Sequence, residues 1–164
     1  MAFLTREAQV LQHDSAKGFV DQITIPVAAG SKILKGAAVA VYISGGLKGY
    51  ATRATGADAT IAVVGRAEHT ADATGLASGQ VEVLVRIGAF KVRFATPVLP
   101  GHLLSKAYVV DDSFLCQLAA LGSAQNYGRI IKVPNPAAFQ DSSEDLGPNE
   151  AMVQFNLGNF DSLA

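Results

Sequence analysis

The chain has 164 residues, a length that fits one domain with a hydrophobic core of its own. Its formal net charge is −1, and charged residues make up 16% of it, below the roughly 25% usual for soluble domains. This balance is not basic enough to suggest a nucleic-acid partner, so we expect none. The low charge fits either a plain neutral protein or a surface that other subunits cover.

The apolar residues are mainly of the kinds that build strands. Hydrophobic residues reach 49% with only 7% aromatic, no Trp and 16 Gly, which favours short strands joined by glycine turns. Cys116 is the only cysteine, so an internal disulfide is excluded. Arg6 and Glu7 stand where a signal peptide would be apolar, and no apolar run approaches the roughly 18 residues of a membrane helix. We expect synthesis in the cytoplasm and no membrane partner.

The first 20 residues have a mixed pattern. They fit a short amphipathic helix or an arm that packs on another subunit, and we favour the arm. Its candidate contact residues are Phe3, Leu4 and Arg6.

From residue 21 the pattern is that of strands. Ile23, Ile25 and Val27 alternate with polar positions, and Pro26 predicts an edge strand or a strand end because it cannot donate to a ladder. Residues 37–43 and 61–69 are further short strands. The glycine-rich SGGLKG at 44–49 lacks the spacing of a phosphate-binding loop and is better interpreted as a hairpin turn.

Residues 80–94 give the clearest signal. Val81, Val83, Val85 and Ile87 share one face of a strand, but the parity reverses after Gly88. A β-bulge explains such a reversal, and so does a sharp turn.

The end of the chain combines strands, a linker and acidic residues. Strands are predicted at 105–110 and 128–133, and three of the six prolines follow in 134–150. From Asp141 onward there are five acids and no Lys or Arg. A last alternating segment could add to a neighbour's sheet or to its own, and its candidate contact residues are Val153, Phe155, Leu157 and Phe160.

These elements predict an all-β protein, with a small β-barrel or β-tulip-like domain at residues 21–133. An N-terminal arm would cover 1–20 and an acidic C-terminal arm 134–164.

No catalytic, metal or cofactor constellation is visible. His13, His69 and His102 are far apart with no partner at ligand spacing, and Cys116 is flanked by leucines, as expected of a buried inert thiol. Asp111 and Asp112 are adjacent, so in a strand they would point to opposite faces. We interpret them as a turn, in which an aspartate bonds to backbone N–H groups two residues on. We therefore expect no enzyme, metal or cofactor.

The order of several short motifs resembles a known family. PVAAGSKILKGAAVAVYISGGLKGYATRATGADATIAVVGRAEH is followed by VEVLVRIGAFKV, by HLLSKAYVVDDSFLCQLAA and by YGRIIKV. Over residues 20–135 this order is similar to the capsid cement, or head decoration, proteins of tailed bacteriophages. In that family a Tyr-Val-Val-Asp-Asp turn precedes a Gly-Arg/Lys-Ile-Val-x-Val strand, matched here by Tyr108 to Asp112 and Gly128 to Val133. The two arms depart from the family's usual short form.

The resemblance implies a structural virion protein on the outer capsid surface, made in the host cytoplasm. Its partner would be the major capsid protein, whose neighbouring subunits it would bridge to stabilise the shell, and it would form a homo-oligomer, a trimer being favoured. The alternatives are another virion component, such as a head fibre base or tail protein, and less favoured, a small-ligand-binding or enzymatic barrel module.

Overall fold

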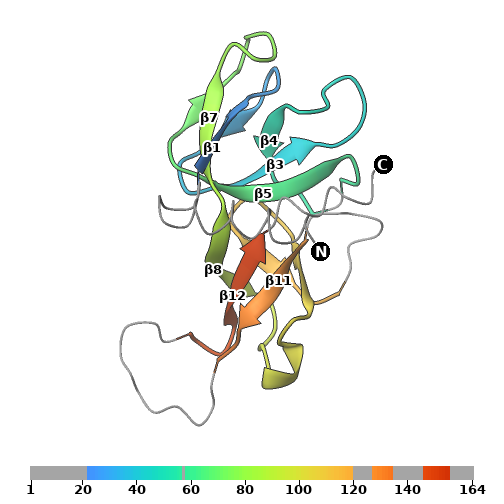
Figure 1. Cartoon of the computed structure of the whole chain (residues 1–164), viewed down its shortest axis with the longest axis vertical. Coiled ribbons are helices and arrows are strands. Elements are labelled where there is room, and N and C mark those ends of the chain that lie inside the picture. Colours follow the sequence, from blue (N-terminus) through green and yellow to red (C-terminus); the bar gives the residue numbers. More distant parts are fainter. Residues whose placement is uncertain (1–21, 57, 120–126, 135–145, 156–164) are drawn as a thin grey trace, which may run out of the picture.

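The computed structural model describes residues 22–56, 58–119, 127–134 and 146–155, and this part of the chain is all-β, as predicted (Figure 1). One short 3₁₀ turn, η1 (Pro100–His102), accompanies the strands. The strands are β1 (Gln22–Pro26), β2 (Lys32–Ile33), β3 (Ala38–Tyr42), β4 (Ala51–Arg53), β5 (Ile61–Ala67), β6 (Ala71–Asp72), β7 (Glu82–Arg86), β8 (Gly88–Phe94), β9 (Lys106–Val109), β10 (Leu115–Gln117), β11 (Tyr127–Lys132) and β12 (Glu150–Phe155).

The first half of the described chain forms a five-stranded antiparallel sheet with the order β1-β7-β5-β3-β4. A bridge between Val27 and Ala51 brings the two edges of the sheet together. The small β2–β6 ladder contributes Ile33 and Ala71 to the apolar cluster of this sheet. β1 is the edge strand that Pro26 predicted. The N–H of Val27 donates to the Val81 carbonyl, 2.8 Å away on the β7 side, so the nitrogen of Pro26 points away from β7 and no bond of the β1–β7 ladder is lost.

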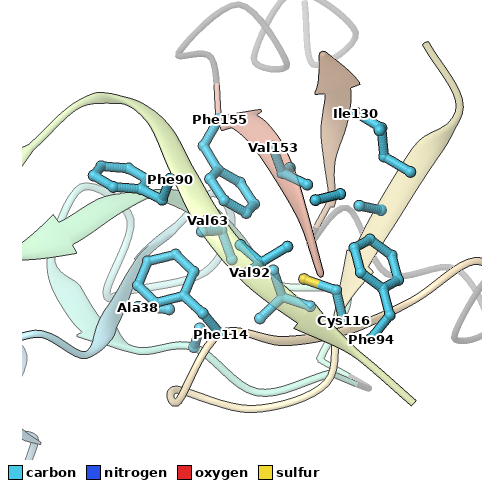
Figure 2. Packing of buried hydrophobic residues seen from close by; sticks show 14 of the residues in the cluster. Ala38, Val63, Phe90, Val92, Phe94, Phe114, Cys116, Ile130, Val153 and Phe155 are labelled. Atoms are coloured by element: carbon cyan, nitrogen blue, oxygen red, sulfur yellow. The ribbon is translucent and has the colours of Figure 1, made fainter. Parts of the chain in front are cut away.

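The second half forms a closed barrel with the order β10-β8-β12-β11-β9. Its interior is an aromatic cluster, in which the ring centroids of Phe90 and Phe114 lie 5.5 Å apart and those of Phe114 and Phe155 lie 5.7 Å apart. Figure 2 shows these rings gathered with aliphatic side chains and with the thiol of Cys116. Alternation along β8 places Phe90 inside and alternation along β12 places Phe155 inside, because successive side chains of a strand point to opposite faces.

The sheet and the barrel are joined end to end (Figure 1), and one of the two apolar clusters, that of the barrel, extends across the junction. The outer face of β3 and β5, including Ala38 and Val63, packs against the barrel's aromatic cluster. The N–H of Ala38 also donates to the carbonyl of Asp112, 2.7 Å away. β3 and β5 are therefore buried on both faces, which explains their continuous apolar runs.

Gly88 marks the point where the chain passes from the sheet to the barrel. β7 ends at Arg86 in the sheet, and β8 begins at Gly88 in the barrel with a φ of 137°, which favours glycine. The parity reversal in the sequence is thus a change of sheet within one extended run. It is neither a bulge inside one ladder nor a chain reversal.

The strand beyond the proline-rich segment corrects one boundary. Residues 134–164 were predicted as an arm, but β12 pairs with β8 from Glu150 to Phe155 and with β11 on its other side. It adds to its own barrel and closes it, rather than adding to a neighbour's sheet. The predicted arm at 1–20, as well as Leu157 and Phe160, lie outside the described residues.

Candidate functional site

The two adjacent aspartates form a turn, as predicted. The Oδ1 atom of Asp111 accepts hydrogen bonds from the N–H of Ser113 at 2.9 Å and from its hydroxyl at 2.6 Å. A longer bond of 3.4 Å comes from the N–H of Leu115, where β10 begins. Asp112 contributes its backbone carbonyl to Ala38, as described above. The pair therefore shapes the β9–β10 connection and joins it to the sheet, a structural role that needs no chemistry.

Cys116 is a buried thiol, as predicted. It is fully buried on β10, inside the barrel. Burial, with a smaller contribution from the charge of Asp111, raises the pKa of Cys116 to about 12. The thiolate needed for nucleophilic attack or metal binding is therefore not available near neutral pH.

Two of the three histidines considered as metal ligands lie in the described part of the chain, and the ring of each contacts a backbone group. The Nε2 atom of His69 lies 3.2 Å from the carbonyl of Glu82, and the Nδ1 atom of His102 accepts from the N–H of Leu99 at 3.0 Å. Among the described residues no three His, Cys, Asp or Glu side chains gather in a way that could hold a metal ion.

The exposed carboxylates are held by neighbouring bases and turns. Asp72 receives bonds from the side chain and N–H of Thr74 and lies 2.9 Å from the ammonium of Lys32; these contacts hold the pKa of Asp72 well below its usual range. Glu150 lies 2.7 Å from the ammonium of Lys91, which lowers the pKa of that carboxyl together with a bond from a backbone N–H. Both shifts favour the charged form, so neither group is poised as a general acid.

A third cluster of charges lies where the sheet meets the barrel. Glu68 Oε1 is 3.4 Å from Arg66 and 3.2 Å from the Nε of Arg86. The Arg86 contact lacks hydrogen-bond geometry, so it is an electrostatic contact only. Arg66 also lies over the ring of Phe90 at 5.4 Å. These charges pack the junction of the two halves.

Two open depressions lie on the barrel. One, of about 480 Å³, is bordered by Lys91, Arg93, Glu150 and the Ser113 turn. Its lysine and carboxylate bond to each other, and its hydroxyl bonds to Asp111. The second, of about 300 Å³, is apolar and lies at the η1 end, where it is lined by Pro97, Val98, Leu99, Pro100, Pro134, Leu146 and Pro148. Neither presents the convergent polar groups of an active site.

Four of the seven exposed large hydrophobic residues in the described part of the chain lie at the barrel end beside this apolar depression. We call these four the η1 patch; they are Leu99, Leu103, Leu104 and Ile131. The sequence did not predict this patch. The available signal was the segment TPVLPGHLL at 96–104, in which leucines occupy a loop that proline and glycine predict to lie at the surface.

The structure separates the predicted contact residues. Val153 and Phe155 are fully buried inside the barrel, so their side chains are not exposed to a partner in this fold. Phe3, Leu4, Arg6, Leu157 and Phe160 lie outside the described residues, and their proposed contacts remain predictions. In the described part of the chain no helix has the length and apolar character to span a membrane.

Compared with known protein families, with curated proteins and with solved structures, the chain has no match in any of the three.

Proposed function

We propose that this chain is a capsid cement, or decoration, protein that binds the outer surface of an icosahedral phage head and bridges major capsid subunits. The observation that carries the proposal is the contrast between the polar motifs and the η1 patch. In the described part of the chain the side chains of Asp111, Glu150 and His69 bond within the fold. Three large apolar residues, Leu34, Leu47 and Leu76, are exposed in the sheet half, and the η1 patch is exposed at the barrel end. Such a surface is typical of a contact with another protein.

The motif order of the sequence supports the same reading. The Tyr-Val-Val-Asp-Asp stretch shared with the cement family is a structural turn here, so its presence is explained by the fold and not by catalysis. The barrel's apolar cluster also extends onto β3 and β5 of the sheet, so the two halves form one packed body. On this proposal the protein acts as a non-enzymatic part of the virion, and no cofactor is required.

Oligomerisation would add to the effect on the shell. A homo-oligomer, with a trimer favoured, presents several copies of the same surface to neighbouring capsid subunits. Linked contacts bind more tightly than each one alone because later contacts form at high effective concentration. Repetition over the shell would then stabilise it against internal pressure, even if each contact is modest.

Co-sedimentation with phage heads tests the proposal. Purified protein is mixed with expanded heads that lack decoration and, as the matched control, with unexpanded heads. We expect it to sediment with the expanded heads only, and to raise their resistance to heat or to chelation. Absence from the expanded-head pellet would overturn the proposal, and label seen at the tail or at head vertices by electron microscopy would favour another virion component.

A further inference from the structure

Leu104 combines two features that both oppose stability. Its φ is 66°, in the left-handed region that leucine rarely adopts, and its side chain is 63% exposed. Glycine would fit this backbone better and would leave no apolar group in water. A fold selected only for stability has no reason to keep leucine here. Strained residues of this kind are concentrated at functional surfaces.

The strained conformation is firmly held. The N–H of Leu104 donates to the carbonyl of Ile130 at 2.8 Å, and the Nη1 of Arg129 donates to the carbonyl of Leu104 at 3.0 Å. The next residue, Ser105, accepts from the N–H of Ile130 at 3.0 Å. These bonds fix the backbone of the loop on β11, so the position from which the leucine side chain projects is set. A backbone that is already ordered loses little entropy when a partner covers it.

The neighbours of Leu104 extend the exposed apolar surface. Leu99 is 58% exposed, Leu103 is 49% exposed and Ile131 is 41% exposed. Backbone bonds to β11 bring the loop beside the end of that strand. In Figure 1 the 3₁₀ turn stands at the lower tip of the barrel, at the end remote from the five-stranded sheet. The η1 patch is therefore a projecting apolar tip.

Cations lie beside this tip. The described residues 95–110 and 127–134 contain Lys106, Arg129 and Lys132, and the acid that follows at the start of β12, Glu150, bonds to Lys91. Lys106 pairs across the strands with Arg129, so two cations stand side by side on the outer face of β9 and β11. Two copies meeting through this tip would bring these cations together, which disfavours a symmetric contact between copies. Charge complementarity instead favours a partner with carboxylates around an apolar hollow.

We propose that the η1 patch is the surface through which this chain docks on the shell, with Leu103 and Leu104 inserted into an apolar hollow of the capsid protein that is bordered by carboxylates. This inference rests on the proposed function and assigns its contact surface. It also gives the barrel a direction: the η1 end faces the shell, and the five-stranded sheet faces away from it.

Leu104→Gly is the sharpest variant because it separates binding from stability. Glycine accepts the positive φ, so we expect thermal stability equal to or above that of the unmodified protein. Loss of a leucine that becomes buried on docking should weaken binding to expanded heads about tenfold or more. Leu103→Ser should act in the same direction. The matched control is Leu34→Ser, which removes a leucine that is 54% exposed at the sheet end and should bind normally.

Binding is measured by quantitative co-sedimentation with undecorated expanded heads at several sodium chloride concentrations, with light scattering on each free variant. Selective loss for the two η1 variants, together with salt-weakened binding of the unmodified protein, supports the proposal. Normal head binding by Leu104→Gly, or an equal loss for Leu34→Ser, overturns it while leaving the proposed function intact. A changed oligomeric state in the free η1 variants also overturns it, since the occupant would then be a second copy. If the unmodified protein binds no heads, both proposals fall.

Discussion

Replacing Phe155 with alanine tests whether β12 is a core strand of the isolated chain. The ring of Phe155 is fully buried, 5.7 Å from Phe114 and 6.3 Å from Phe90 between centroids. Truncating a buried phenylalanine costs about 3–5 kcal/mol, and lost aromatic pairs add about 0.5–1.5 kcal/mol each beyond area. Since the remaining rings can partly collapse into the space, we expect Phe155→Ala to lower the unfolding free energy by about 4–5 kcal/mol, which is close to the whole stability of many domains.

The assay is urea unfolding followed by far-ultraviolet circular dichroism. Phe155→Leu keeps the variant folded if alanine does not, with an expected loss of about 1–2 kcal/mol. Gln154→Ala is the matched control: it lies on the same strand with an exposed side chain and should change the unfolding free energy by less than about 0.5 kcal/mol. A loss below about 1 kcal/mol for Phe155→Ala would refute the packing described here, and β12 would then have to act outside this barrel.

Three further predictions concern the turn, a close backbone approach and the thiol. Asp111→Ala should lower the unfolding free energy by about 1–3 kcal/mol, because it removes the carboxylate that accepts the turn's hydrogen bonds. Asp112→Ala should cost less, because Asp112 contributes its backbone carbonyl, which alanine keeps. Equal losses would contradict the turn geometry. Gly128→Ala should lower the unfolding free energy by about 1–3 kcal/mol, because the new Cβ would lie 2.7 Å from the backbone oxygen of Gln154 on β12. Gly101→Ala is the control and should be neutral, because the space around Gly101 is open. Two neutral variants would contradict the register of β11 and β12. Iodoacetamide should leave Cys116 of the native protein unmodified at every pH from neutral to mildly alkaline, because the thiol is buried and its raised pKa keeps it protonated. In urea the same thiol should be modified. Rapid labelling of the native protein would show an accessible thiolate.

Local patterns predicted most strands because the physics that forms them is local. The alternation of Val83 and Val85 marks a half-buried strand wherever it lies, and Pro26 restricts its strand to an edge. The role of Asp111 was also predictable, because an Asx turn is made with residues two and four positions away.

The arrangement of those strands was less predictable because it depends on distant pairings. β12 follows a proline-rich segment, and nothing in its own alternation distinguishes addition to its own barrel from addition to a neighbour. Its pairing with β8 joins residues that are 57 to 67 positions apart in the sequence. Gly88 signalled a change of face, but the sequence did not show that two different sheets meet there.

The η1 patch was missed for a related reason. Leucines in a loop predict nothing until the backbone is known, since a loop can fold them inward as easily as outward. It is the positive φ of Leu104, together with its two bonds to β11, that turns an ordinary loop residue into a projecting side chain. This conformation is imposed by tertiary contacts and leaves no mark in local composition.

Cryo-electron microscopy of expanded heads decorated with the purified protein tests the central claim most directly. We expect added density on the outer shell surface, with the barrel's η1 end against the capsid subunits and the five-stranded sheet pointing outward. Density with the sheet end against the shell would contradict the assigned docking surface. Heads without added density, or density confined to the tail, would contradict the proposed function itself.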